Sequence, residues 1–257
     1  MKRLLKILLL VPVIYTVAIP FWFSHSSGLV SCAGLNVIIS DSSDYRFVTH
    51  GEIVARVNSG KVRYAGVPLN DINLEDIEKR VATISELRKT EAYFTIDGRL
   101  NVEVDQRRPV LRVVSSAGLE YYVDNDGYVI RKRGLYAPRL HIATGRIDIS
   151  EGYISGLKVG DKGLPGILTD LFNLTGFLRS DNLWSAMIDQ IEVRNGGDII
   201  LIPRTGGHRI ILGDVSDLEE KFSTLGEFYR QAMPEAGWDR YSTINLKYKG
   251  QIVCKVK

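Results

Sequence analysis

The chain has 257 residues, of which 45% are hydrophobic and 25% are charged, a composition typical of folded domains with hydrophobic cores. Its 33 basic and 30 acidic residues give a formal net charge of +3, and three unopposed basic residues lie at the amino-terminal tip. The remainder is therefore neutral, which argues against a binder of nucleic acid or of another polyanion. Two cysteines, Cys32 and Cys254, exclude a dense disulfide framework. We expect them not to pair, because Cys32 lies just before the first predicted exterior strand and Cys254 lies in the last one.

A long uncharged run near the amino terminus predicts a membrane anchor. Residues 7–23 carry no charge, whereas Lys2, Arg3 and Lys6 precede them. At about 1.5 Å per residue, such a helix approaches the roughly 30 Å of a bilayer core, and basic flanking residues stay in the cytoplasm. We therefore expect a cytoplasmic tip at residues 1–6, one transmembrane helix at residues 7–23 and an exterior remainder. The residues expected to anchor the chain include Ile7, Ile14, Trp22 and Phe23.

Two other interpretations of this segment stay open. A cleaved signal peptide also has basic residues before an apolar run, although this run is longer than usual and residues 24–26 (Ser-His-Ser) form a weak cleavage site. A lipoprotein signal is the second alternative, because residues 29–32 (Leu-Val-Ser-Cys) resemble a lipobox. That tetrapeptide does not directly follow the apolar run. We favour the retained anchor, followed by a linker at residues 24–34.

Strand and helix signals alternate at the start of the exterior region. Residues 35–39 read as a strand. Thr49 and Glu52 have the spacing of a capping box and begin a first short helix. Asn73 then precedes apolar residues spaced at three and four, which predicts a second helix as far as about Leu87.

Two hairpins are predicted next. Strands at residues 93–96 and 100–104 flank Asp97-Gly98, a strong turn signal. Residues 121–129 contain a second turn at residues 124–127 (Asp-Asn-Asp-Gly). This acidic turn could suggest calcium, yet it lacks the further ligands and the distal Glu of a calcium loop. Asn, Asp and Gly tolerate the positive φ of a turn, so we interpret it as a turn.

Helical spacing returns in the second half of the chain. Residues 164–188 carry a broad apolar stripe, which we interpret as core, with a groove for a partner as the alternative. Glycine-containing turns separate predicted strands at residues 191–193, 199–202 and 208–212, and a last helix is predicted over residues 218–229.

The sequence offers no sign of catalysis or of a cofactor. None of the histidines, His25, His50, His141 and His208, has a metal-ligand partner at helical or hairpin spacing. The sequence contains no phosphate loop, nucleophile elbow or zinc-protease motif. The densest basic run, residues 131–133, is interpreted as a solvated turn. We therefore predict no catalytic, cofactor-binding or metal-binding residue.

The last fourteen residues keep one face apolar and the other largely polar. From residue 244 onward, even positions are apolar and odd positions are mostly polar or basic. A two-residue hairpin at Lys249-Gly250 would place Tyr248 opposite Gln251 and so mix core and solvent residues on each face. The alternation instead predicts one long strand, bent at Gly250.

Four lysines on the polar face of this segment mark it as the edge of a sheet. Charged residues protect an edge from indiscriminate pairing, and simple protection is one interpretation. The functional interpretation is an edge that docks one partner strand. The residues predicted to bind that partner are Ile244, Leu246, Lys247, Tyr248, Gly250, Gln251 and Val253. For Tyr248 the even position leaves open whether the ring faces a partner or the core.

The order of these elements resembles a known family of bacterial envelope proteins. The strand-helix-helix-strand-strand order resembles a POTRA domain, and the elements after it resemble the division proteins FtsQ and DivIB. The motifs that carry the resemblance are residues 66–69 (Gly-Val-Pro-Leu), 99–104 leading into 108–110 (Arg-Pro-Val), the hairpin at 121–129, residues 211–213 (Ile-Leu-Gly) before a helix with Lys221, and residues 244–248 (Ile-Asn-Leu-Lys-Tyr). The resemblance covers nearly the whole chain.

This resemblance implies an α+β protein with a single amino-terminal transmembrane helix. A POTRA domain at residues 35–109 would precede a mixed β-sheet domain with flanking helices at residues 110–257. The implied role is a non-catalytic scaffold at the division septum of the inner membrane that binds FtsB-type and FtsL-type partners and thereby regulates septal peptidoglycan synthesis. No nucleic acid, small-molecule substrate or cofactor is expected, and self-association stays open.

Two other functions are kept beside the scaffold. Another POTRA-bearing envelope protein, such as an assembly or secretion accessory, would carry tandem POTRA repeats or a following membrane barrel, and the sequence shows neither. An envelope enzyme would depend on a polar cluster away from partner surfaces.

Overall fold

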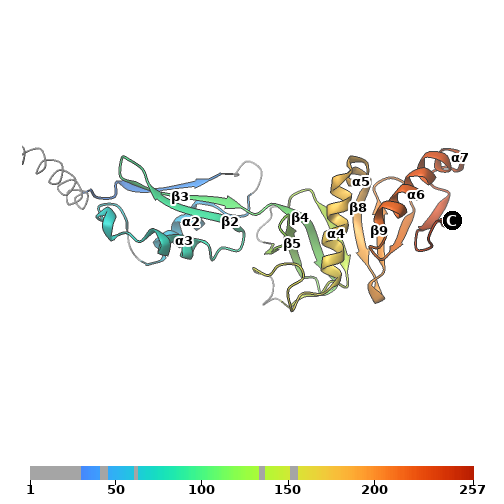
Figure 1. The fold of residues 1–257 in the computed structure, drawn as a ribbon, viewed down its shortest axis with the longest axis horizontal. Coiled ribbons are helices and arrows are strands. Elements are labelled where there is room, and N and C mark those ends of the chain that lie inside the picture. Colours follow the sequence, from blue (N-terminus) through green and yellow to red (C-terminus); the bar gives the residue numbers. More distant parts are fainter. Residues whose placement is uncertain (1–29, 41–45, 61–62, 133–136, 151–155) are drawn as a thin grey trace, which may run out of the picture. The chain divides into compact units, whose positions relative to one another are not determined.

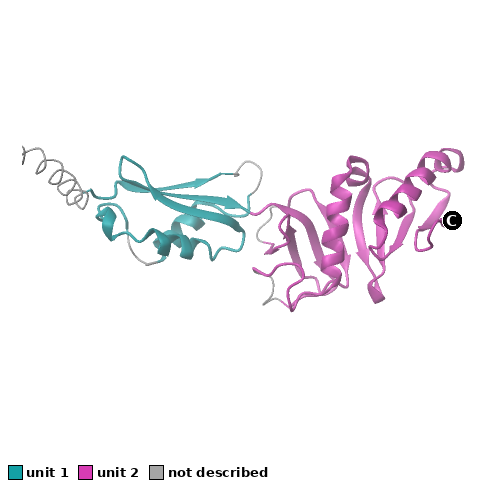
Figure 2. Ribbon diagram, in the orientation of Figure 1, with its two compact units in different colours: residues 1–106 teal, residues 107–257 magenta. Residues whose placement is uncertain are grey.

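The computed structural model describes residues 30–40, 46–132, 137–150 and 156–257, except residues 61–62. The predicted anchor, residues 7–23 with Ile7, Ile14, Trp22 and Phe23, lies outside the described residues. Among the residues that are described, no helix is both long and apolar enough to cross a membrane. The chain divides into two compact units, residues 1–106 and residues 107–257 (Figure 2).

The first unit contains a three-stranded sheet with two helices and shows the predicted strand-helix-helix-strand-strand order (Figure 1). The central strand β3 pairs in parallel with β1 and antiparallel with β2. The elements are β1 (Gly34–Ile39), α2 (His50–Val57), the 3₁₀ turns η2 (Asn58–Gly60) and η3 (Leu69–Asp71), α3 (Leu74–Val81), β2 (Leu87–Phe94) and β3 (Arg99–Gln106).

Local capping begins both helices of this unit as predicted. The Thr49 hydroxyl accepts a hydrogen bond from the Glu52 amide at 3.2 Å, and the Asn73 side chain accepts one from the Asp76 amide at 3.0 Å. The glycine of the predicted hairpin turn, Gly98, has φ of 78°, a value that glycine adopts without strain.

The predicted end of the second helix at Leu87 is wrong, because α3 ends at Val81. The Ile84 amide donates to the Val81 carbonyl, and the Leu87 amide donates to the Ile84 carbonyl, each at 3.0 Å across three residues. The chain therefore continues in turns before β2. Ile84 and Leu87 are nevertheless buried in the core, so their helical spacing reflects burial rather than helix.

The second unit contains a nine-stranded mixed sheet in the order β12-β11-β10-β9-β8-β7-β4-β5-β6. The pairs β4–β7, β7–β8 and β10–β11 are parallel and the others are antiparallel. The strands are β4 (Pro109–Ser115), β5 (Glu120–Asp124), β6 (Val129–Arg131), β7 (His141–Gly145), β8 (Ile188–Val193), β9 (Ile199–Pro203), β10 (Arg209–Gly213), β11 (Tyr241–Asn245) and β12 (Val253–Val256).

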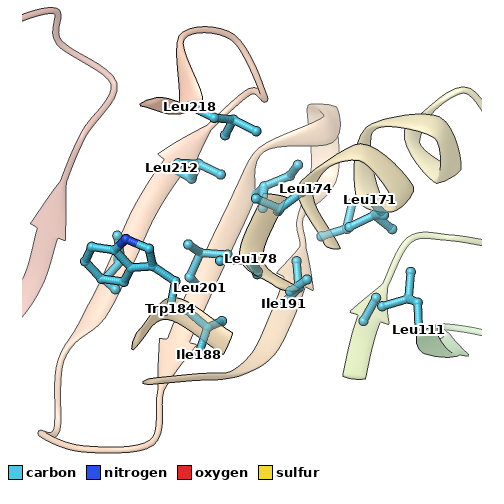
Figure 3. Close-up of a cluster of buried hydrophobic side chains, with 14 of the residues drawn as sticks. Leu111, Leu171, Leu174, Leu178, Trp184, Ile188, Ile191, Leu201, Leu212 and Leu218 are labelled. Atoms are coloured by element: carbon cyan, nitrogen blue, oxygen red, sulfur yellow. The ribbon is translucent and has the colours of Figure 1, made fainter. Parts of the chain in front are cut away.

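Helices cover one face of this sheet (Figure 1). They are α4 (Ile167–Ser180), α5 (Asn182–Met187), α6 (Leu218–Gln231) and the short α7 (Met233–Ala236), and a 3₁₀ turn η5 (Asn195–Gly197) joins β8 to β9. Leu171, Leu174 and Leu178 of α4 are fully buried in the core that includes Leu111 and Leu201 of the sheet (Figure 3). The interpretation of the 164–188 stripe as core is confirmed, except at Leu183, which is 59% exposed.

The predicted single strand at the end of the chain is wrong. β11 and β12 are two antiparallel strands, with Ile244 opposite Cys254 and Asn245 opposite Val253. The seven residues from Leu246 to Ile252 form the connection between them. An odd-length connection places even residues opposite even residues, so it preserves the alternation that a two-residue turn would break. Cys254 and Cys32 are both free, as expected.

Candidate functional site

The last strand, β12, forms one edge of the nine-stranded sheet. Its side chains are mostly exposed, including those of Val253 (48%) and Val256 (55%). Lys255 between them is also exposed. Exposed valines on an unpaired strand edge are unusual, because such an edge can pair with another chain.

Two backbone hydrogen bonds fix which groups of β12 face away from the sheet. The Lys257 amide donates to the Arg240 carbonyl at 3.1 Å, so the amides of odd-numbered residues in β12 face β11. The Leu246 amide donates to the Ile211 carbonyl at 2.9 Å, which directs even residues of β11 toward β10 and odd residues toward β12. Both bonds indicate that the odd-numbered residues of β11 and β12 direct their backbone groups toward each other. The backbone N–H and C=O groups of Cys254 and the N–H group of Val256 therefore point outward, whereas the Val256 carbonyl accepts a hydrogen bond from the Ser242 hydroxyl at 3.5 Å.

The connection between β11 and β12 is tied to the body of the sheet. The Lys247 ammonium lies 3.0 Å from each carboxylate oxygen of Asp198, and the Lys247 amide donates to the Asn245 side chain at 2.9 Å. Gly250 has φ of 67°, and the Gln251 amide donates to the Tyr248 carbonyl at 3.1 Å. These contacts leave the Tyr248 side chain 57% exposed beside the edge.

A groove separates this connection from the start of α6. Its walls include Tyr248 and Gln251 on one side and Asp214 and Lys221 on the other. The Lys221 ammonium donates to the Asp214 carboxylate at 2.8 Å and to the Asp214 carbonyl at 2.9 Å. The hydrogen bond from Lys221, together with those from Ser216, holds the pKa of Asp214 far below its ordinary value. Asp214 in the wall of the groove therefore stays ionised.

The predicted partner-binding residues fall into two sets. Ile244 and Leu246 are buried, at 0% and 3% exposure, and their side chains belong to the core. The others lie on the exposed connection or on the edge strand; they are Lys247, Tyr248, Gly250, Gln251 and Val253. Partner contact by any of these residues stays a prediction.

Sequence reasoning missed Val256 as an exposed member of the edge. The alternation placed its side chain on the apolar face with Cys254, yet it lies near the end of the sheet and is 55% exposed. No sequence signal distinguishes a terminal position of this kind. The same alternation left open whether the Tyr248 ring faces a partner or the core. The structure places Tyr248 on the connection between β11 and β12 rather than in a strand.

The acidic turn at residues 124–127 has a structural explanation. One Asp124 carboxylate oxygen accepts hydrogen bonds from the amides of Asp126 (3.0 Å) and Tyr128 (2.7 Å), and the other accepts from Arg107 at 2.8 Å. The carboxylate is fully buried. It holds the turn between β5 and β6, as the turn interpretation predicts. Within the described ranges, no group of three or more His, Cys, Asp or Glu side chains could hold a metal ion.

The two described histidines of this unit lie in or beside strands and are buried. The His208 Nε2 lies 2.7 Å from the Tyr229 hydroxyl, and burial is the main cause that lowers the pKa of His208. Burial also raises the pKa of the Tyr229 hydroxyl. This pair is thus a neutral contact within the core.

Comparison with known families agrees with the architecture. A family described as FtsQ/DivIB, C-terminal related, matches residues 108–255, which is more than half of the chain, and a POTRA-like domain matches residues 30–105. Comparison of the sequence with curated proteins finds no significant match. The resemblance expected from the order of the motifs is confirmed. The chain belongs to the FtsQ/DivIB family and carries a POTRA-like domain before its family-specific β-sheet unit.

Proposed function

We propose that this protein is a non-catalytic scaffold of the bacterial division machinery that binds an extended segment of an FtsB-type or FtsL-type partner along β12. The family match supports the division role. The observation that carries the binding mode is the open edge of β12, with outward backbone groups at Cys254 and Val256. Binding at this edge would link the partner to septal peptidoglycan synthesis.

Strand addition supplies both affinity and selectivity at such an edge. Outward N–H and C=O groups pair with the incoming backbone, and each hydrogen bond contributes about 0.5–1.5 kcal/mol net. The exposed side chains of Val253, Val256 and Tyr248 offer apolar contacts along the same edge. Lys255 adds exposed positive charge, and Lys249 adds more although it lies 3.6 Å from the Glu220 carboxylate. This charge favours a partner segment with acidic residues and opposes basic ones.

The proposed setting is the inner membrane at the division septum. The uncharged run at residues 7–23 would cross the membrane once, the basic tip would lie in the cytoplasm and both folded units would lie in the periplasm. Sequencing the amino terminus of the mature protein tests this part, because a chain that begins near residue 27 or at a lipidated Cys32 would contradict a retained anchor.

Proline scanning along β12 tests the binding mode. Val256→Pro removes an outward N–H group without breaking a bond to β11, so the fold should persist, since proline is tolerated where the N–H faces solvent. Binding to the periplasmic segment of the FtsB-type partner should fall at least about tenfold, because the proline removes one ladder bond and obstructs approach. Isothermal titration calorimetry measures the affinity, and circular dichroism follows the melting temperature.

Two control variants make the test specific. Val253→Pro removes an inward N–H group and should lower the melting temperature, because that amide faces β11. Val256→Thr keeps the outward N–H and should retain most of the affinity. If Val256→Pro stays folded and binds like the unmodified protein, the partner does not add a strand to β12.

A further inference from the structure

A second pocket of the β-sheet unit lies away from the partner edge and gathers positive charge. It lies beside the amino ends of the strands that begin at Pro109, His141 and Ile188. Four arginines and one acid are the charged residues of its lining, namely Arg112, Arg139, Arg179, Arg204 and Asp189. They come from five segments that are separate in the sequence, so the fold alone brings them together.

The arginines of this pocket are only partly neutralised. Arg204 pairs with Asp189 at 2.9 Å, and Arg112 pairs with Glu120 at 2.7 Å. Glu120 is shared with Lys132, whose ammonium lies 2.6 Å from the same carboxylate oxygen. For Arg139 and Arg179, the part of the chain that the structure describes offers no carboxylate partner.

Two residues that line the pocket also carry buried nitrogens without hydrogen-bond partners. His141 is 8% exposed, and its Nε2 atom has no hydrogen-bond partner among the described residues. The buried Nε atom of Arg112 likewise has no hydrogen-bond partner among the described residues. A buried polar atom without a partner costs about 1–3 kcal/mol, so such atoms call for an explanation. Here both line one pocket with an excess of positive charge.

We propose that this pocket binds the phosphate group of a soluble phosphate or phosphomonoester. A phosphate dianion offsets the excess charge, and its tetrahedral oxygens can accept from donors that converge from several directions. A carboxylate offers acceptors in one plane only. His141 would complete the site as a donor once its ring is protonated.

The protonation of His141 makes the proposal distinctive. Burial, with Arg179 and Arg204 nearby, lowers the pKa of His141, while the Ser185 backbone and Asp189 act in the opposite direction. Arg112 and Arg139 are the remaining charged groups of the pocket. A bound dianion would offset the arginines and raise the pKa of the ring, so binding takes up a proton. The affinity for a dianion therefore rises as pH falls.

Titration calorimetry of the full-length chain with inorganic phosphate and with glycerol 3-phosphate tests the site. We expect saturable binding that Arg179→Gln weakens at least about tenfold, because a hydrogen bond to a charged group contributes that much or more. Arg194→Gln is the matched control, since Arg194 lies in the same unit outside the pocket and pairs with Glu192 at 3.0 Å. Equal weakening by both variants would reduce the effect to overall charge and overturn the site.

Sulfate provides the pH test, because it stays a dianion throughout the working range. From about pH 8 to about pH 6 its affinity should rise at least about threefold in the unmodified protein and stay flat in His141→Gln. A pH-independent affinity in the unmodified protein would exclude the role of His141.

Competition experiments decide the ligand class. Acetate that competes as well as phosphate would overturn the choice of a tetrahedral anion. Binding to phosphatidylglycerol vesicles without binding to the soluble phosphates would overturn the choice of a soluble ligand. None of these measurements uses the division partner, so their failure is distinct from failure of strand addition at β12.

Discussion

The two edges of the nine-stranded sheet differ in whether another segment of the chain covers them. At one edge, β6 is covered by the following segment, because the Val129 amide donates to the Leu157 carbonyl at 2.9 Å and the Val159 amide donates to the Gly127 carbonyl at 2.8 Å. Tyr128 and Lys158 also form a bridge there. At the other edge, β12 carries exposed valines and outward backbone groups. The protein closes one edge and leaves the other open.

This difference indicates that the open edge is specific to β12 rather than a general property of the sheet. An edge that only needed protection from aggregation could be covered in the same way as β6. Instead, β12 keeps its hydrogen-bonding groups and is flanked by lysines and by Tyr248. The contrast can be tested at both edges.

The largest expected effect lies near the closed edge, at Asp124. Asp124→Asn removes the charge that pairs with Arg107 in a fully buried position, and the free energy of unfolding should fall by about 3–5 kcal/mol. Urea denaturation measures the change. Asp126→Asn in the same turn is the control, because Asp126 is exposed, and its effect should stay within about 0.5 kcal/mol. Equal effects of the two variants would contradict the role of Asp124.

At the open edge, Tyr248→Ala should separate binding from stability. The ring is 57% exposed, so the free energy of unfolding should change by no more than about 0.5 kcal/mol. Affinity for the partner should fall by about 2 kcal/mol if the ring is an interface hot spot. Calorimetry and thermal unfolding of the same preparation measure both quantities. A large loss of stability with unchanged affinity would remove Tyr248 from the interface.

A smaller loss of stability is expected when the segment that covers β6 loses a hydrogen bond to it. Val159→Pro removes the hydrogen bond to Gly127 and should lower the free energy of unfolding by about 1–1.5 kcal/mol. Hydrogen exchange should then accelerate at the neighbouring Val129 amide. Val159→Ala keeps the N–H group and should leave that amide protected. Unchanged exchange in the proline variant would show that the segment does not protect β6.

The smallest effect concerns the acidic wall beside the open edge. The pKa of Asp214 is lowered in the folded state, so its ion pair with Lys221 stabilises the fold above the unfolded pKa, near 4, and this contribution is lost as pH falls below that value. Asp214→Asn should cost less than about 1 kcal/mol at neutral pH, because the carboxylate is exposed. The difference between the two proteins should begin to shrink near pH 4 and should vanish only below the lowered pKa of the folded state. A constant difference in melting temperature across this range would argue against the ion pair.

Sequence reasoning succeeded where a few adjacent residues determine the structure. The Thr49 cap and the Asp97-Gly98 turn depend on hydrogen bonds or dihedral angles within four residues, and both were predictable. It failed at the end of α3. Ile84 and Leu87 have the spacing of a helix and are buried, but Ile84 lies in a turn and Leu87 begins a strand. The spacing of apolar residues indicates which side chains are buried, but burial alone does not determine whether the backbone is helical.

Strand pairing could not be predicted for a different reason. The alternation after residue 244 is compatible with one strand or with two strands joined by an odd number of residues, and the structure shows the second, with β12 paired to β11. The pocket that Arg112 and Arg204 line likewise depends on pairing, since β4 and β9, which are far apart in the sequence, belong to the same sheet. The lysines on the polar face predicted the edge, but neither the pairing of β12 with β11 nor this pocket has a local signature.

The anchoring of Lys247 has a consequence for how a partner would associate. Because Lys247 contacts Asp198 and Asn245, the connection beside β12 already holds one conformation in the free protein. The loss of conformational entropy on association would therefore fall on the incoming segment rather than on this protein. Shortening or pre-forming that segment as a strand should then change its affinity more than stiffening the connection around Lys247.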